Sequence, residues 1–372
     1  MNETMQNLMR EATRLTQSGN LKEATLVIQR ALGPTGRAPT PPPSSATASP
    51  PIILDGCVFE VDPADVARAR TPCAEAAAPA SNSTGEFVTG SHTHASLTRR
   101  YRLYTPPGSL GKRLPLVVML HGCTQSPDDF AAGTGMNALA QTQGFCVLYP
   151  EQSASANPQR CWNWFKHNHQ GRGKGEAALL ASMTLSIVQQ QGIDARRVYI
   201  AGLSAGGAMA AIVAAAYPEV FAAVGVHSGL AVGAAGNVAE ALSAMKSGAA
   251  DRKLASVGSA LPLIVFHGDQ DSTVHPRNGR QVSDQGIDAL RAESEPSEMS
   301  EKSVEQGTSS LGRSFTRTCH LKDGVSVSES WVLHGGAHAW SGGSAAGSYT
   351  DPSGPDASAE MLRFFSNHAK KA

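Results

Sequence analysis

The sequence has no excess of charge of either sign, because 31 Lys and Arg residues balance 31 Asp and Glu residues. Without a basic surplus, we expect no nucleic-acid binding and no attraction to an anionic membrane. No stretch reaches the ~18 consecutive apolar residues that a membrane span needs. Charged residues run through positions 1–30, where a secretory signal would need an apolar centre. These features predict no membrane span and favour a cytoplasmic location.

Cysteine is also scarce: the chain has six, and none forms a Cys-x-x-Cys pair. They are too few and too scattered for a disulfide scaffold, so reduced thiols are the default expectation and a single bridge remains open. The pairs His92-x-His94 and His167-x-His169 have no Cys or carboxylate ligands in a matching pattern. We therefore expect no metal site at these histidines.

Composition divides the 372 residues into three parts. Residues 1–32 show apolar positions at helical spacing on both sides of Gly19, which predicts a small helical hairpin. Two short helices bury little surface alone, so we expect the hairpin to self-associate or to dock on another surface. Residues 33–84 are predicted to be a Pro-, Ala- and Ser-rich linker followed by an irregular segment. The main domain is predicted over residues 85–372.

Strands alternate with helices in this main domain. Several predicted strands are continuous apolar runs, as is typical of parallel strands buried on both faces. We predict strands at 86–94, 100–104, 116–120, 146–149, 198–201, 223–226, 263–266 and 328–333, with helices such as 176–191 and 208–217. The pattern favours an α/β fold with a mostly parallel sheet, whose first two strands form an antiparallel edge. Residues 281–313 are rich in Ser and Glu and are predicted to be a mobile insertion.

Residues 201–207 read Ala-Gly-Leu-Ser-Ala-Gly-Gly, between a predicted strand and a predicted helix. This arrangement predicts a nucleophile elbow, in which Gly202 and Gly206 leave room for a tight turn that exposes Ser204. A Gly-x-Ser-x-Gly pattern alone is weak evidence in a chain with 37 glycines. The interpretation gains specificity from the acid and the histidine that follow in the chain.

A nucleophilic serine needs a histidine as base and a carboxylate to orient that histidine. Asp269 and Asp271 both follow the strand at 263–266. Asp271 is favoured because residues 267–274 fit the pattern His-Gly-x-x-Asp-x-x-Val, the usual arrangement of the acid loop in α/β-hydrolases. Asp269 is interpreted as a residue that stabilises the turn. His338 is favoured as the base because it lies on the glycine-rich loop after the last strand, whereas His334 lies at the strand's end.

Two backbone N–H groups are predicted to form an oxyanion hole. One belongs to Ala205, which follows the nucleophile at the start of a helix. The other belongs to Cys123, on the His121-Gly-Cys-Thr-Gln125 loop that follows the strand at 116–120. Cys123 lacks the strand–turn–helix setting of Ser204 and is the weaker nucleophile candidate.

With His121-Gly-Cys-Thr-Gln125, Cys161-Trp-Asn-Trp-Phe165 and the three catalytic candidates in one chain, residues 85–369 resemble the poly(3-hydroxybutyrate) depolymerase family of esterases. The resemblance implies an α/β-hydrolase fold with helices on both faces of the sheet. It also implies a Ser204–Asp271–His338 triad, an oxyanion hole at Cys123 and Ala205, and ester hydrolysis without metal or cofactor. The family includes feruloyl and acetylxylan esterases, so several ester substrates remain open.

Relatives that attack polymer outside the cell often carry a signal peptide and a separate substrate-binding domain, neither of which this sequence displays. The favoured substrates are therefore 3-hydroxybutyrate oligomers or other short-acyl esters. A serine peptidase on the same fold and an inert hydrolase-like scaffold are the rival interpretations.

Trp162, Trp164 and Trp340 are candidate walls of a substrate pocket. For Trp162 and Trp164, packing beneath the loop is the alternative interpretation. In an oxidising compartment, Cys123 and Cys161 are a candidate disulfide pair.

Overall fold

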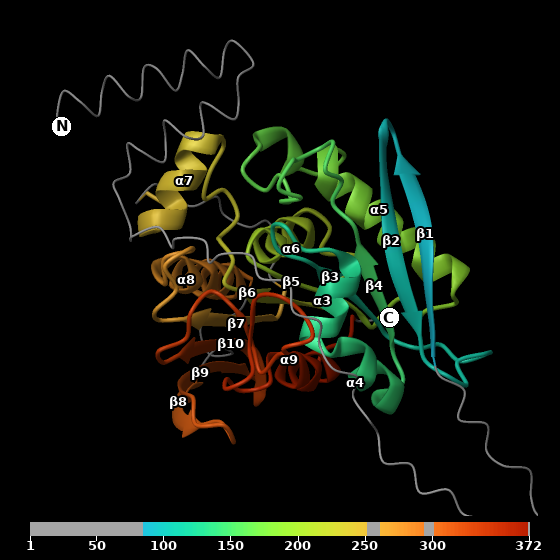
Figure 1. Ribbon diagram of the computed structural model, residues 1–372. Coiled ribbons are helices and arrows are strands. Elements are labelled where there is room, and N and C mark those ends of the chain that lie inside the picture. Colours follow the sequence, from blue (N-terminus) through green and yellow to red (C-terminus); the bar gives the residue numbers. More distant parts are fainter. Residues whose placement is uncertain (1–84, 251–260, 294–300, 371–372) are drawn as a thin grey trace, which may run out of the picture. The chain divides into compact units, whose positions relative to one another are not determined.

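A ten-stranded sheet organises the residues that the computed structural model describes, which are 85–250, 261–293 and 301–370 (Figure 1). The strand order is β1-β2-β4-β3-β5-β6-β7-β10-β9-β8. The strands are β1 (Glu86–His94), β2 (Leu97–Thr105), β3 (Leu116–Leu120), β4 (Cys146–Pro150), β5 (Val198–Leu203), β6 (Ala223–His227), β7 (Leu263–Gly268), β8 (Glu301–Thr308), β9 (Ser314–Lys322) and β10 (Val325–Leu333). Strands β11 (Trp340–Ser341) and β12 (Thr350–Asp351) form a separate short pair. The predicted hairpin at 1–32 and the linker at 33–84 lie outside the described residues.

The six central strands, from β4 to β10 in the sheet order, are parallel to one another. Antiparallel pairs flank them on both sides, since β1 pairs with β2 and β8 with β9. The predicted antiparallel edge formed by the first two strands is therefore confirmed. Parallel strands end at the same edge of a sheet, so the loops after β3, β5, β7 and β10 gather there.

Strand β3 illustrates why these apolar runs become central strands. Leu116, Val118 and Leu120 pack into one hydrophobic core, and the intervening Val117 and Met119 pack into a second core on the other face. Successive side chains in a strand point to opposite faces, so a continuous apolar run serves both cores. Each such buried side chain stabilises the fold by about 1.5–3 kcal/mol.

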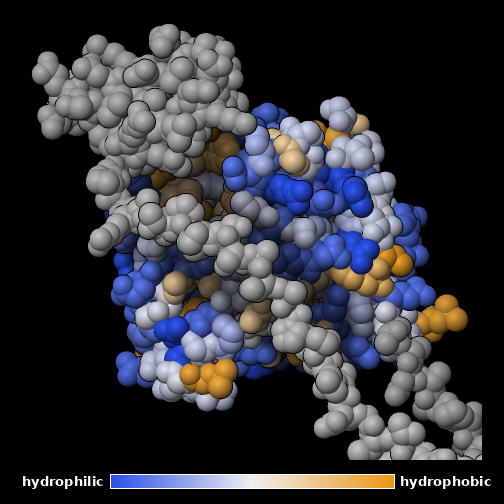
Figure 2. Space-filling view, in the orientation of Figure 1, coloured by the Kyte–Doolittle hydropathy of each residue, from blue (hydrophilic) through white to orange (hydrophobic). Residues whose placement is uncertain are grey.

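Helices cover both faces of the sheet, as predicted. Buried residues of α5 to α8 contribute to one core, and those of α3, α4 and α9 to the other. The helices are α3 (Pro127–Thr134), α4 (Met136–Gln143), α5 (Gly175–Gln190), α6 (Ala205–Ala216), α7 (Val238–Ser247), α8 (Arg277–Ala292) and α9 (Ala357–Ser366), with a short 3-10 turn at His167–His169. Within the described ranges, no helix combines the length and the apolar character that crossing a bilayer requires. In Figure 2, hydrophilic residues dominate the coloured surface and apolar residues form small separate areas.

The prediction of a mobile insertion over 281–313 is wrong for the described part of that segment. Most of α8 lies there, and β8 extends the sheet by pairing with β9. Helix α8 buries Val282, Ile287 and Leu290, which recur at helical spacing. Arg, Asp and Gln residues on the other faces of α8 obscured this sparse apolar pattern in the sequence.

Candidate active site

Ser204 occupies the turn between β5 and α6, as the sequence predicts. Its backbone has φ 57° and ψ −121°, a conformation with positive φ that residues other than glycine rarely adopt. Such strain amounts to about 1–3 kcal/mol per residue and is concentrated at functional sites. The serine is mostly buried, and its N–H donates to the carbonyl of His227 on the neighbouring strand β6.

The two glycines of the elbow allow close backbone approach. A Cβ atom added at Gly206 would lie 2.0 Å from the carbonyl oxygen of Leu120 and 2.6 Å from that of His121. A Cβ atom at Gly202 would lie 2.5 Å from the Gly206 carbonyl. The elbow therefore packs against the end of β3 with no room for a side chain.

Gly206→Ala is expected to lower the free energy of unfolding by about 1–3 kcal/mol and to reduce activity, because rigid backbone must move to admit the methyl group. Urea unfolding of the purified variant measures the change. Gly171→Ala is the matched control, since a Cβ there has no neighbour within 4 Å and the backbone φ is ordinary. Equal stability of the two variants would contradict this account of the elbow.

Asp271 and His338 form a buried pair. His338 Nδ1 donates to Asp271 Oδ2 at 2.6 Å, and the two side chains are 11% and 0% exposed. The other carboxylate oxygen accepts from the N–H groups of Thr273 and Val274. Burial alone would raise the pKa of Asp271, but the contacts with His338 and Val274 outweigh it and leave the pKa below its usual value. The ionised Asp271 therefore binds His338 through Nδ1, and Nε2 takes no part in this bond.

The two rejected alternatives, Asp269 and His334, pair with each other. His334 Nδ1 lies 3.0 Å from Asp269 Oδ2, and these side chains are 43% and 34% exposed. His334 Nε2 also hydrogen bonds with Thr316 Oγ1, and Asp269 accepts from the Gly335 N–H. Two Asp–His pairs therefore join the loops after β7 and β10, and only one of them is buried.

His227 connects the elbow with the His338 loop. Its carbonyl accepts from Ser204 N–H, and its Nε2 accepts from Ser341 N–H at 3.0 Å. The ring also stacks on Trp340, with centroids 5.1 Å apart. Burial lowers the pKa of His227 to about 3, so the ring is neutral and can accept that hydrogen bond at neutral pH.

Acidification is expected to destabilise the fold through His227. Because its folded-state pKa lies below the value of about 6.5 for an exposed histidine, the unfolded chain binds the proton more readily. This contribution to stability is complete above pH ~6.5 and is lost as the pH falls towards the folded-state pKa. Between pH ~6.5 and ~4.5, the loss is about 2 kcal/mol. Urea unfolding at both pH values should show a smaller loss for His227→Gln, and an equal loss in variant and wild type would refute this assignment.

The His121-Gly-Cys loop lies against the elbow. A Cβ atom at Gly122 would lie 3.6 Å from Ser204 Cβ. The amides on either side of Cys123 already have acceptors: Gly122 N–H donates to Gln125 Oε1, and Thr124 N–H donates to the Gln159 carbonyl. Thr124 has φ 65°, a second strained residue beside the site. The Ala205 N–H begins α6, where helix amides have no intrahelical acceptor. These positions suit the Cys123 and Ala205 amides as oxyanion donors.

The three tryptophans pack inside the protein. Trp162, Trp164 and Trp340 are at most 5% exposed and belong to the two hydrophobic cores. Trp162 lies near His121, and Trp340 packs edge-on against Phe130. Their burial removes them as walls of an open substrate pocket and favours the packing interpretation.

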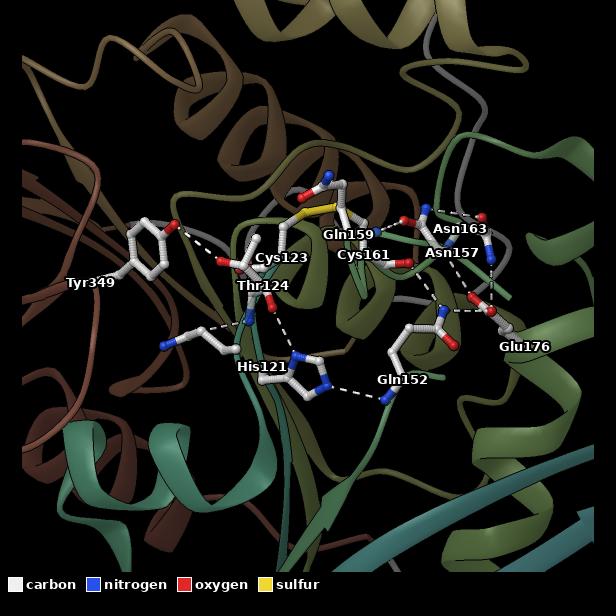
Figure 3. Close-up of a disulfide and its surroundings, with 12 residues drawn as sticks. His121, Cys123, Thr124, Gln152, Asn157, Gln159, Cys161, Asn163, Glu176 and Tyr349 are labelled. Atoms are coloured by element: carbon white, nitrogen blue, oxygen red, sulfur yellow. Dashed lines mark hydrogen bonds between the residues drawn. A yellow bond between two sulfur atoms is a disulfide. The ribbon is translucent and has the colours of Figure 1, made fainter. Parts of the chain in front are cut away.

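A disulfide joins Cys123 to Cys161, with an S–S distance of 2.03 Å (Figure 3). The bridge that the sequence left open is thus present, whereas Cys146 and Cys319 are buried free thiols. It ties the Cys123 loop to the Cys161-Trp-Asn-Trp segment, 38 residues away in sequence.

Two buried polar residues at this end of the sheet were missed in the sequence. His227 ends an apolar strand, and Glu176 is an isolated carboxylate in the first turn of the apolar helix α5. An acidic residue among apolar helix positions was a signal that pointed to a buried role for Glu176. Across the part of the chain that the structure describes, no group of three or more His, Cys, Asp or Glu side chains is placed to hold a metal ion.

Comparisons with known proteins match this chain in its central part. A family model described as esterase PHB depolymerase matches residues 99–292, just over half of the chain. Poly(3-hydroxyalkanoate) depolymerase C of Paucimonas lemoignei is 35% identical over 48% of this chain and 46% of its own length. Acetylxylan esterase A of Talaromyces purpureogenus is 29% identical over 51% of this chain and 53% of its own length. The chain thus spans about half the length of these curated relatives.

Among solved structures, an acetyl xylan esterase from Aspergillus awamori superposes with a TM-score of 0.57 at 20% identity. The match covers 72% of this chain and 94% of that structure. At this identity the likeness concerns the fold, and it confirms the predicted α/β-hydrolase architecture.

Proposed function

Because the chain belongs to the PHB depolymerase family of esterases, we propose that it is a serine hydrolase that cleaves carboxylic esters. The observation that carries the proposal is the largely buried Asp271–His338 pair, on loops at the same edge of the parallel sheet as the Ser204 elbow. His227 contacts both the elbow and the loop of the base. Family membership and this geometry point to the same chemistry.

In the proposed reaction, Ser204 Oγ attacks the ester carbonyl and His338 Nε2 accepts its proton. The developing oxyanion is stabilised by the N–H groups of Cys123 and Ala205, each worth about 3–4 kcal/mol. His338 then gives the proton to the departing alcohol. A water molecule, deprotonated by the same histidine, attacks the acyl-serine, and the histidine returns that proton to Ser204 Oγ as the acid is released. Asp271 stays ionised and stabilises the imidazolium.

The proposed substrates are short-acyl esters, with 3-hydroxybutyrate oligomers first among them. The relative in Paucimonas lemoignei is named for poly(3-hydroxyalkanoate), and those in Talaromyces and Aspergillus are named for acetylxylan. Both substrate classes present a short acyl group on an alcohol oxygen, which one oxyanion hole and one triad can serve.

A substrate panel tests the proposal. Turnover of 3-hydroxybutyrate oligomers, acetylated xylan, methyl ferulate and p-nitrophenyl acetate is measured with the same enzyme preparation. Faster cleavage of the hydroxybutyrate oligomers supports the depolymerase-like assignment, and faster release of acetate from xylan reassigns the substrate. A matched ester and amide complete the panel. Comparable rates on that pair would indicate a peptidase, because an amide expels a much poorer leaving group. If no ester is cleaved, the interpretation that remains is an inert hydrolase-like scaffold.

The disulfide bears on where the enzyme works. Structural disulfides persist in oxidising compartments and are rare in the reducing cytosol. The Cys123–Cys161 bridge therefore favours an oxidising environment over the cytoplasmic location expected from the sequence.

A further inference from the structure

Glu176 is a buried carboxylate with an unusual number of partners. Its Oε1 accepts from Arg99, at 3.1 Å, from the Gln152 side chain, at 2.6 Å, and from the Asn163 side chain, at 2.8 Å. Its Oε2 accepts from the Asn163 N–H at 2.7 Å. Burial alone would raise the pKa of Glu176, but contacts with His169, Gln152 and Asn163 outweigh it and hold the pKa at about 2. The carboxylate is therefore charged at neutral pH.

Stability alone is a weak reason for such an arrangement. Removing an ion from water costs several kcal/mol, and replacing a buried ion pair by apolar side chains is often neutral or stabilising. A buried, fully bonded carboxylate does fix the geometry of its partners, because each bond is short and directional. The partners of Glu176 lead to the Cys123 loop by two routes.

The first route passes through the disulfide. Glu176 binds the backbone and the side chain of Asn163, and the Gln152 side chain donates to the Cys161 carbonyl at 3.0 Å. The segment around Cys161 is thus held on both sides of Trp162. Cys161 is bonded to Cys123, so this anchoring reaches the loop covalently (Figure 3).

The second route ends on the peptide that carries the proposed oxyanion donor. Glu176 holds the Gln152 side chain, and the Gln152 N–H donates to His121 Nε2 at 3.1 Å. His121 Nδ1 donates in turn to the Gly122 carbonyl at 2.7 Å. Burial lowers the pKa of His121 to about 4, which keeps the ring neutral, with one donor and one acceptor nitrogen.

The Gly122 carbonyl and the Cys123 N–H belong to the same peptide unit. In a trans peptide the C=O and N–H bonds point in opposite directions from a rigid plane. A bond that fixes the carbonyl towards His121 therefore also fixes the direction of the N–H. The disulfide restrains the same residue through its side chain.

We propose that Glu176 is a positioning residue for the oxyanion hole, acting through His121 and through the Cys123–Cys161 disulfide to orient the Cys123 N–H. This inference rests on the proposed esterase function. Glu176 itself touches no reacting atom. Its effect is confined to states in which the carbonyl oxygen carries negative charge.

Glu176→Gln tests the inference, with rates expressed per active site titrated by the burst of p-nitrophenol. We expect kcat to fall about tenfold to a hundredfold, less than the loss of a whole donor, while KM changes little. A trifluoromethyl ketone that adds to Ser204 places its oxyanion in the hole. Its inhibition constant should rise by the same factor by which kcat/KM falls.

Two further variants complete the test. Cys161→Ser removes the disulfide and leaves the Glu176 network in place, so it tests the first route if Glu176→Gln fails to fold. Its kcat should also fall, and the double variant should lose less than the product of the two single losses, because both act on one amide. Glu219→Gln is the matched control. That glutamate forms an exposed ion pair with Arg172, and kcat should be unchanged.

Unchanged kcat per titrated site and unchanged inhibitor affinity in Glu176→Gln and Cys161→Ser would overturn the inference and leave both residues a purely structural role. This result is distinct from failure of the proposed function. In that case, the wild-type protein itself would show no Ser204-dependent ester cleavage, whatever the two variants do.

Discussion

Ser204→Ala is expected to reduce kcat for ester cleavage by about 10⁵- to 10⁶-fold, because the attacking oxygen is removed and no acyl-enzyme can form. The residual rate comes from the oxyanion hole and from substrate binding, which do not depend on the hydroxyl. The fold should be preserved, since alanine differs from serine at this position by one oxygen atom. Activity is measured on p-nitrophenyl acetate, with circular dichroism as the check on folding.

Ser228→Ala is the matched control for this prediction. Ser228 directly follows the neighbouring strand β6, has φ 49° and is fully buried. It thus shares the strained backbone and the burial of Ser204 but does not precede a helix as Ser204 precedes α6. We expect it to keep turnover of the same order as the wild type. Similar losses in both variants would indicate that the effect is structural, and full turnover in Ser204→Ala would remove Ser204 as the nucleophile.

The central part of the fold was predictable because its signals are local. The runs at β3, β5 and β7 are continuous and apolar, and each ends in a glycine-containing turn. Gly202 and Gly206 mark the elbow by the side chains that they lack. These features depend on residues that are neighbours in the sequence, so they can be recognised from the sequence alone.

The missed features depend on contacts between distant segments. Strand β8 is recognisable only beside β9, and the apolar positions of α8 are too few to stand out from its polar faces. The bonds from Glu176 reach Arg99 and Gln152, which are far from it in sequence. No spacing rule identifies such partners.

The two Asp–His pairs show the same limit within the site. Position after the strands narrowed the acid to Asp269 or Asp271 and the base to His334 or His338, and spacing within each loop favoured Asp271 and His338. The sequence did not predict that the remaining two would pair with each other. Burial separates the pairs, and only the structure supplies it.

Asp271→Asn is expected to lower kcat about 10⁴-fold, because an amide can no longer hold His338 in the tautomer that accepts the serine proton. Asp269→Asn should change kcat much less. The Asp269–His334 pair is partly exposed, and exposed pairs of this kind contribute about 1 kcal/mol or less. Steady-state kinetics on one soluble ester, with active sites titrated in each variant, compares the two directly.

The comparison separates two explanations because the two substitutions are chemically identical and lie two residues apart. Both change a contact between the loop after β7 and the loop after β10. A general weakening of the contact between the β7 and β10 loops would lower activity in both variants by similar factors. Loss of a specific proton-transfer geometry would lower it in Asp271→Asn alone. If Asp269→Asn had the larger effect, the exposed pair would be the catalytic one, and His334→Ala should then abolish turnover while His338→Ala preserves it. The burial of Asp271 and its bond to His338 lead us to expect the opposite order.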